Sequence, residues 1–472
     1  MGHSYLVIGG GISGLSAAWA VLQADPTAGV TVLEGSPALG GKIASAPVAG
    51  VALDTGAESL LARRPEGLQL IDELHLSDDV VHPQTAQASL WSRGRLHPLP
   101  GGTVMGIPGD PSVLSPLLTA SEILRALDER AAEPAPRQDI SVGDFVADRL
   151  GDAVVDRLIE PLLGGVYAGH AREISLAAAL PTMLPAHQDG TSLLQAVRAA
   201  LPAPVPEDAV RPPVFAGLEG GVHRIVDALA KALRASGAVL HEGVTARELN
   251  RRPAESGGGF DVVTGPRPSP TLWQADRLIV ATPPSSSARL LRGIVPVAAD
   301  VLADIEMASM AIVTLALPAD QAPSFAGSGI LVPPLEGLSV KASTFSGNKW
   351  DWVRHRGEGR DDRTVFVRAS IGRHREESDL QRSNDELVNI VRADLEALVG
   401  QSVPVPLDAH VQRWGGALPQ YAVGHLERVA VVRREVSAVP GLAVCGAAYN
   451  GVGIPACIAS GRSAAAQVCR AQ

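Results

Sequence analysis

The sequence predicts a mixed α/β fold whose main domain is built from segments far apart along the chain. Three observations support this prediction. An apolar strand at residues 5–8 runs directly into a glycine-rich turn and a helix. A second apolar strand, residues 276–281, follows an excursion of shorter strands, and a third, residues 442–445, leads into the last helix. Strand–turn–helix units of this kind form doubly wound parallel sheets, so we expect the remaining segments to be inserted between them.

Composition and charge narrow the class of protein. The 472 residues are 46% hydrophobic and 19% charged, which suits a globular protein of two or three domains with a large core. The net charge of -10 argues against nucleic acid as a partner. No apolar run approaches the roughly 18 residues of a membrane span, and no basic segment precedes an apolar one at the N-terminus. We therefore expect a cytoplasmic location with at most peripheral membrane contact.

The cysteines and histidines show no metal-binding pattern. Cys445, Cys457 and Cys469 are odd in number and form no CxxC pair, and the 12 histidines include no HExxH spacing. We expect reduced thiols and no bound metal.

The first element is a strand, Tyr5 to Ile8, followed by Gly9-x-Gly11-x-x-Gly14 and a helix. In this motif the first glycine permits a tight turn, the second admits a pyrophosphate, and the third lets the helix pack closely on the strand. The next strand, "VTVLE", ends at Glu34, where a carboxylate can accept hydrogen bonds from ribose hydroxyls. These features together predict dinucleotide binding but leave NAD and FAD open.

The next segment approaches the same ligand. "EGSPALGGKIAS" places Gly40, Gly41 and Lys42 shortly after Glu34, and "GVALDTGAESLLARRPE" adds Gly56 and Ser59. A glycine pair here suggests backbone passing close to the ligand, although an ordinary turn would also explain it.

The middle of the chain completes the domain. "VLHEGVTARELNR" predicts a strand that ends near Val244, "GFDVVTG" and "PTLWQA" predict a hairpin, and "ADRLIVATPP" predicts a returning strand. A strand excursion inserted into a doubly wound domain resembles the glutathione-reductase class of FAD-binding domain, in which the cofactor domain is discontinuous.

The C-terminal segment predicts a second contact with the cofactor. After the strand at residues 442–445, Gly451 and Gly453 precede a helix that carries Pro455 in its first turn. The glycines would let backbone amides approach a planar ring, and the positive end of the helix would face negative charge on a reduced flavin.

Over nearly its full length the chain resembles the FAD-dependent protoporphyrinogen and coproporphyrinogen oxidases of heme biosynthesis. The matching stretches are "GGGISGLSAA", "LDTGAESLLARRPE", "LHPLPGGTVMGIP", "PLLGGVYAG", "FAGLEGGVHRIVDAL", "GSGILVPP", "STFSGNKW", "RWGGALPQYAVGH" and "AAYNGVGIPACIASG". Lys42 stands where arginine is frequent in the family.

The resemblance implies three domains and FAD as cofactor. The FAD-binding domain would comprise residues 1–75, 211–284 and 411–472. An amine-oxidase-like substrate domain would comprise 76–100 and 285–410, with a helical subdomain at 101–210. The implied cofactor residues are Gly9, Gly10, Gly11, Ile12, Ser13, Gly14, Glu34, Gly35, Lys42, Gly56, Ala57, Glu58, Ser59, Val244, Trp414, Val452, Gly453 and Ile454.

The implied reaction is an oxygen-dependent, six-electron oxidation of a porphyrinogen to a porphyrin with hydrogen peroxide as by-product. The flavin carries the chemistry, so we expect no catalytic side chain. The substrate's propionates require cations. The candidates are Arg63, Arg64, Arg93, Arg95, Lys341, Lys349 and Arg368, and Tyr167 could line the macrocycle although a core position is favoured for it.

The alanine- and glycine-rich, lysine-poor composition and the resemblance to bacterial members favour coproporphyrinogen III over protoporphyrinogen IX. A flavin amine oxidase and a non-enzymatic binding protein of the GDP-dissociation-inhibitor kind share the fold and remain alternatives. We expect a tetrapyrrole and oxygen as partners, with transient contact to later enzymes of heme synthesis.

Overall fold

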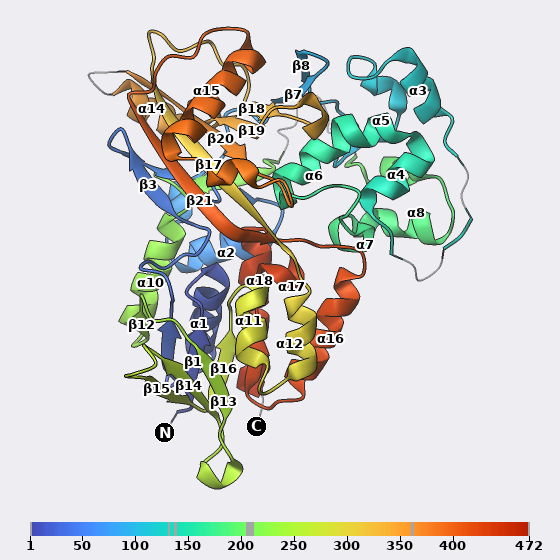
Figure 1. Cartoon of the computed structure of the whole chain (residues 1–472). Coiled ribbons are helices and arrows are strands. Elements are labelled where there is room, and N and C mark those ends of the chain that lie inside the picture. Colours follow the sequence, from blue (N-terminus) through green and yellow to red (C-terminus); the bar gives the residue numbers. More distant parts are fainter. Residues whose placement is uncertain (1, 131–132, 136–138, 204–211, 360–362, 471–472) are drawn as a thin grey trace.

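The computed structural model describes the chain except for residues 1, 131–132, 136–138, 204–211, 360–362 and 471–472. At its base lies a five-stranded parallel sheet in the order β12-β2-β1-β16-β22 (Figure 1). These strands span Val239–His241, Gly29–Leu33, Ser4–Ile8, Arg277–Val280 and Leu442–Val444, respectively. The predicted parallel sheet, assembled from distant segments, is therefore confirmed.

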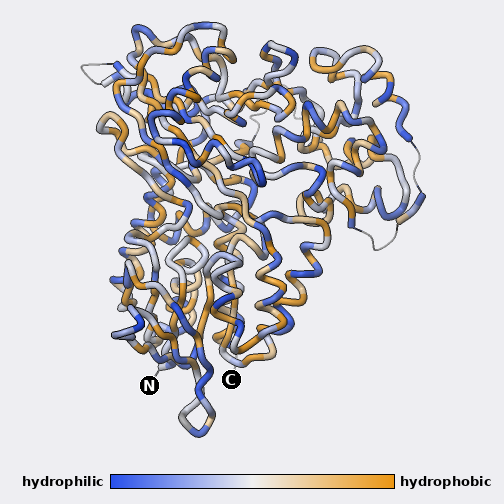
Figure 2. Tube along the Cα trace, in the orientation of Figure 1, coloured by the Kyte–Doolittle hydropathy of each residue, from blue (hydrophilic) through white to orange (hydrophobic). Residues whose placement is uncertain are grey.

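Helices cover both faces of this sheet. One face carries α1 (Ile12–Ala24), α2 (Pro65–Glu73), α10 (Arg224–Ala235) and α18 (Ile454–Arg470), which share an apolar core with β1 and β2. The other face carries α11 (Pro284–Leu291), α12 (Pro296–Ala303) and α16 (His425–Ser437). Figure 2 shows apolar and polar residues alternating along α12 and α16, as expected of helices with one buried face. The sheet is thus doubly wound.

A small antiparallel sheet extends the same core. It comprises β13 (Glu248–Arg251), β14 (Phe260–Thr264) and β15 (Thr271–Ala275), in that order, and confirms the predicted hairpin. One predicted boundary is wrong: β12 ends at His241, not near Val244. The reason is Gly243, whose φ of 70° turns the chain so that its amide donates to the Ser36 carbonyl.

A seven-stranded sheet lies above the five-stranded parallel sheet, and its strands are in the order β21-β17-β20-β19-β18-β7-β8 (Figure 1). Its strands span Asp408–Pro419, Met307–Pro318, Thr364–Ile371, Val340–Phe345, Gly329–Leu331, Ala88–Ser92 and Arg95–Pro98, respectively. All neighbours are antiparallel except β18 and β7. Helix α15 (Asn384–Val399) packs on one face of this sheet.

The segment 101–210, expected to be helical, packs around an apolar core of its own. Its helices are α3 (Ala120–Leu127), α4 (Val142–Leu150), α5 (Asp152–Val154), α6 (Glu160–Tyr167), α7 (Leu176–Ala179), α8 (Leu184–Gln188) and α9 (Leu193–Ala200). Among the described residues no helix is both long and apolar enough to cross a membrane.

Packing bears on the predicted domain boundaries without settling them. Helices α11 and α12 fall in the segment assigned to the substrate domain, yet they pack on the five-stranded sheet. Strand β21 runs across the boundary placed at residue 410 and pairs with β17 along its length. The boundaries remain a prediction.

Candidate cofactor and active site

The turn between β1 and α1 is shaped by its glycines. Gly9 has a φ of 113°, which favours glycine strongly. A Cβ on Gly14 would lie 1.9 Å from the Gly9 carbonyl oxygen, so only glycine lets α1 start this close to β1. Gly11 precedes α1, and no side chain caps the helix there. The first turn of α1 therefore offers backbone amides to an anionic ligand.

Glu34 is held at the end of β2 by two backbone amides. Gly10 N donates to Oε2 at 2.6 Å and Ser36 N donates to Oε1 at 2.8 Å. Val244 N donates to the Glu34 carbonyl at 2.7 Å, which brings the segment after β12 beside it. This arrangement aligns the carboxylate for a ligand with neighbouring hydroxyl groups.

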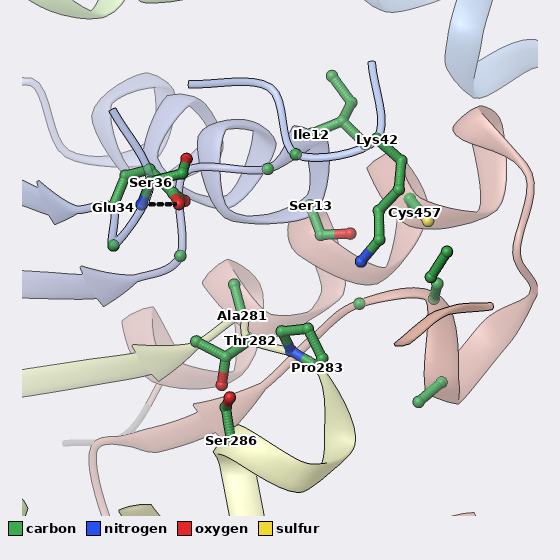
Figure 3. A pocket seen from close by; sticks show the side chains of 18 of the residues that line it. Ile12, Ser13, Glu34, Ser36, Lys42, Ala281, Thr282, Pro283, Ser286 and Cys457 are labelled. Atoms are coloured by element: carbon green, nitrogen blue, oxygen red, sulfur yellow. Dashed lines mark hydrogen bonds between the residues drawn. The ribbon is translucent and has the colours of Figure 1, made fainter. Parts of the chain in front are cut away.

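These elements open onto a cavity of about 480 Å³, a size typical of cofactor sites. Twelve of the predicted cofactor residues line it: Gly9, Gly11, Ile12, Ser13, Glu34, Gly35, Lys42, Ala57, Val244, Trp414, Val452 and Ile454. Figure 3 shows Glu34 and Ser36 at one side of the cavity and Lys42 with Cys457 at the other, with Ser13 between them. The structure thus brings together segments from both ends of the chain.

The other six predicted cofactor residues are neighbours of the cavity. Gly10 and Gly14 shape the glycine turn, and Gly56 lies directly behind Ala57. Gly453 is exposed at the start of α18, and Ser59 is half-buried ahead of β5 (Leu60–Leu61). Glu58 does not line the cavity and pairs instead with Lys349 and Arg368. Roles for these six as direct cofactor contacts stay predictions.

Lys42 reaches into the cavity from the segment after the Gly40–Gly41 pair (Figure 3). Its side chain is exposed, yet desolvation by the surrounding walls lowers the pKa of its ammonium, an effect that Cys457 and Glu34 partly oppose. Gly41 has a φ of 60°, and a Cβ there would lie 3.3 Å from the Gly11 Cα. The close approach explains the glycine pair, and the segment that follows it places Lys42 in the cavity wall.

The C-terminal loop closes the far end of the cavity. Gly451 has a φ of 131°, and α18 begins at Ile454 with Pro455 in its first turn, as predicted. Tyr421 donates a hydrogen bond to the Ala447 carbonyl. His425 stacks on Tyr421 at a ring distance of 4.0 Å, and its Nε2 lies 2.9 Å from the Ala448 carbonyl oxygen. Two aromatic side chains therefore fix the short helix α17 (Ala447–Asn450) against the cavity.

His425 is held neutral by its surroundings. Burial lowers the pKa of the imidazole to about 4, although the hydrogen bond to Ala448 acts in the opposite direction. Since the carbonyl accepts, Nε2 carries the proton in the neutral ring.

None of the predicted substrate-binding residues lines this cavity. Arg64 pairs with Glu66 at 2.7 Å, and Tyr167 is buried against Tyr421. Lys341 is buried and donates to the Gly372 carbonyl at 2.8 Å; burial, and then Arg373, lowers the pKa of its ammonium to about 7.

The remaining cations differ in their partners. Arg368 and Lys349 pair with Glu58, and Arg93 pairs with Glu122. Arg63 is exposed, and within the described part of the chain it has no polar partner. Arg95 is also exposed, and its Nε donates to His97 Nε2 at 3.3 Å, so within the described residues Arg63 and Arg95 are the exposed predicted cations without a carboxylate partner.

Sequence reasoning missed part of the cavity wall. The missed residues include Ser36, Thr245, Thr282, Pro283, Ser286, Arg289, Met307, Leu418, Pro419, Ala447 and Cys457. Thr282 and Pro283 follow β16 at the same sheet edge as Gly9, so the rule that ligands bind at the carboxyl ends of parallel strands could have found them. Met307 pairs with Pro419 across β17 and β21, and this long-range pairing leaves no local signal.

Comparison with known proteins gives a consistent result. The family model described as flavin containing amine oxidoreductase matches residues 12–469. The coproporphyrinogen III oxidase of Mycobacterium tuberculosis (strain ATCC 25618 / H37Rv) is 39% identical over 467 residues, 98% of this chain and 96% of that protein. The protoporphyrinogen oxidase of Macaca fascicularis is 30% identical over 99% of this chain and 98% of its own length. The crystal structure of a provisionally named protoporphyrinogen oxidase from Exiguobacterium sp. 255-15 superposes with a TM-score of 0.85 at 30% identity, covering 99% of both chains.

Proposed function

The chain belongs to the flavin-containing amine oxidoreductase family and is an FAD-dependent oxidoreductase, and we propose that it oxidises coproporphyrinogen III to coproporphyrin III in heme biosynthesis. The observation that carries this proposal is the 39% identity to a coproporphyrinogen III oxidase over nearly the whole of both chains. The cavity supports the binding of FAD. Glu34 at one end suits the ribose of the adenosine, and the opposite end, closed by the C-terminal loop, would hold the flavin ring.

The residues present suit FAD. Glu34 would accept hydrogen bonds from the adenosine ribose, and the amides of the first turn of α1 would hold the diphosphate. Lys42 would add a cation near the diphosphate or ring. The remainder of the cofactor would then extend away from Glu34, towards Ala57, Trp414 and Val452.

Bound FAD would supply the redox chemistry, accepting hydrogen from the macrocycle and passing electrons to oxygen. Three such oxidations remove six electrons and six protons from the porphyrinogen, and three molecules of oxygen take them up as three of hydrogen peroxide. The protein's own contribution is to bind, to orient and to exclude water. Three apolar residues line the end of the cavity that would hold the flavin ring and are suited to excluding water: Met307, Leu418 and Ile454.

Substrate carboxylates need an available cation, and Arg63 is the candidate. It follows β5, and the neighbouring helix α2 lies against the start of α18, because a Cβ on Gly67 would come within 3.4 Å of Pro455 and 3.0 Å of Leu60. Arg63 therefore lies on a segment beside the C-terminal loop that closes the cavity. A propionate of the macrocycle is the anion it would bind.

The proposal is tested by porphyrin fluorescence. FAD-loaded protein is mixed anaerobically with coproporphyrinogen III or protoporphyrinogen IX, and oxygen is then admitted; protein stripped of FAD is the control. Faster production of coproporphyrin III by the loaded protein is the expected result. Preference for protoporphyrinogen IX would keep the chemistry and change the substrate. No oxidation of either macrocycle above the control rate would overturn the proposal.

A further inference from the structure

A buried cluster of three charges lies behind the part of the cavity wall that Ala57 forms. Glu58 comes from the loop after β4 (Val51–Asp54), Lys349 ends the short helix α13 (Ser346–Lys349), and Arg368 lies in β20. Lys349 Nζ is 2.6 Å from Glu58 Oε1, and Arg368 Nη1 donates to Oε2. Their side chains are only 15%, 16% and 9% exposed for Glu58, Lys349 and Arg368, respectively. The loop and the seven-stranded sheet are thus joined by contacts between residues about 300 positions apart.

Hydrogen bonds connect this charge triad, defined as Glu58, Lys349 and Arg368, to the cavity wall. Arg368 Nη2 donates to the Gly56 carbonyl at 2.7 Å. The next residue, Ala57, donates its amide to the Lys42 carbonyl at 3.0 Å. A Cβ on Gly56 would lie 1.9 Å from that same Lys42 oxygen, so the two segments touch directly. Because Ala57 and Lys42 both line the cavity, the hydrogen bond from Arg368 helps to hold this wall in place.

The triad carries a net positive charge. It contains two cations and one carboxylate, and no second carboxylate contacts Lys349 or Arg368 in the described residues. Lys349 Nζ instead lies 5.6 Å from the Phe215 ring centre and 5.3 Å from that of Trp350. Burial by itself would raise the pKa of Glu58, but Lys349 and Arg368 lower it to about 2, so the carboxylate is ionised at neutral pH. Buried charges are weakly screened by salt, so the excess charge acts on nearby groups.

We propose that the triad positions the Gly56–Ala57 wall against the flavin ring and, through its net positive charge, stabilises the reduced, negatively charged ring. The proposal rests on FAD in the cavity and not on the identity of the substrate. The ring end lies opposite Glu34, and Ala57 together with Trp414 forms the wall that separates it from the triad. Glu58 and Arg368, expected from the sequence to contact cofactor and substrate, would then act as positioning residues.

The charge is tested by the midpoint potential of bound FAD and by its affinity for sulfite, a probe that adds to the ring and leaves negative charge on it. Lys349→Met removes one positive charge and should move the potential to a more negative value and raise the sulfite Kd about tenfold. Glu58→Gln removes the negative charge and should move both quantities in the opposite direction. Lys231→Met, an exposed lysine of α10, is the matched control and should change neither. All measurements are made without porphyrinogen, so failure of the proposed substrate would not affect them.

Positioning is tested with conservative variants. Lys349→Arg keeps the charge and should restore the wild-type potential, whereas Arg368→Lys keeps the charge but replaces the two nitrogens that reach Glu58 and Gly56 separately by a single one. Arg368→Lys should therefore raise the FAD Kd severalfold with little change in potential. If Lys349→Met does not retain FAD, Glu58→Gln and Lys349→Arg still decide the question. Equal potentials in all FAD-loaded variants, or shifts of the same sign in Glu58→Gln and Lys349→Met, would overturn the proposal.

Discussion

At the scale of single residues, the site is held by groups that fix one another before any ligand binds. Glu34 is aligned by the amides of Gly10 and Ser36, and Ala447 and Ala448 are held by Tyr421 and His425. Such preorganised polar groups lower the entropic cost of binding. A change at Glu34 should therefore alter cofactor affinity more than global stability.

Replacing Glu34 with alanine should weaken FAD binding roughly 100-fold, because the ribose loses a charged acceptor and two amides lose their partner. Titration of FAD into stripped protein, followed by quenching of flavin fluorescence, measures the effect. Glu248→Ala, at an exposed position in β13, is the control. An unchanged Kd in a folded Glu34→Ala variant would remove Glu34 from the site.

His425 should make stability depend on pH. Its pKa of about 4 in the folded protein lies below the ordinary 6.5, so folding favours the neutral ring. This contribution to the unfolding free energy is complete above pH 6.5. It is lost as the pH falls from 6.5 towards 4, and the total loss is roughly 3 kcal/mol.

His425→Gln keeps an amide donor for the Ala448 carbonyl and removes the titration. The unfolding free energy of the wild type minus that of this variant, measured by urea denaturation from pH 7 to 4.5, should decrease as the pH is lowered. Val429→Ala, in the same helix, removes no titratable group and should give a constant difference. A constant difference for His425→Gln as well would show that the pKa of this ring does not change on unfolding.

At the scale of elements, glycines decide how closely helices approach strands and each other. Gly14 lets α1 meet β1, and a Cβ on Gly461 of α18 would lie 2.2 Å from the Ser13 carbonyl oxygen of α1. Both contacts set the position of α1, whose first turn borders the cavity. The glycine turn and the C-terminal helix therefore form one structural unit although they are separated by the length of the chain.

Gly14→Ala should lower the unfolding free energy by about 3 kcal/mol and weaken FAD binding, because the new methyl group forces α1 away from β1. Gly29→Ala is the matched control, since a Cβ at Gly29 in β2 meets nothing within 4 Å, and its effect should stay within about 0.5 kcal/mol. Urea denaturation of both variants provides the comparison. Equal stabilities would mean that the two elements can separate without cost.

At the scale of the whole molecule, the cavity joins segments from Ile8 to Cys457 and is roofed by the ends of β17 and β21 from the second sheet. A ligand in this position would contact segments of both sheets. It should stabilise the protein as a unit, because ligand binding to the folded state alone adds to its unfolding free energy.

FAD at a free concentration of 1,000 times its Kd should raise the unfolding free energy by about 4 kcal/mol. Hydrogen exchange with and without FAD should show added protection in the segments 9–14, 282–290, 414–419 and 446–457, all of which border the cavity. FMN, which lacks the adenosine that Glu34 would bind, is the control and should protect less. Protection confined to residues 9–43 would show that the second sheet takes no part in binding.

The sequence by itself determined the elements and motifs whose causes are local. The strand at Tyr5–Ile8, the glycine turn, Glu34 and the Pro455 helix start each follow from residue type and spacing within a short window, and the structure agrees. The core of the parallel sheet also follows, because the apolar runs of β1, β16 and β22 each lead into a helix. Twelve of the cofactor residues that the family resemblance implied line one cavity.

Only the tertiary structure decided which charges are free to act. Glu58, Lys349 and Arg368 look like ligand contacts in sequence, and their mutual pairing depends on a loop meeting a sheet about 300 residues away. Met307 and Pro419 reach the cavity through strand pairing, and Lys341 is buried by the strands around it. Local sequence records a side chain's chemistry but not its neighbours, because burial and ion pairing are set by contacts between distant segments.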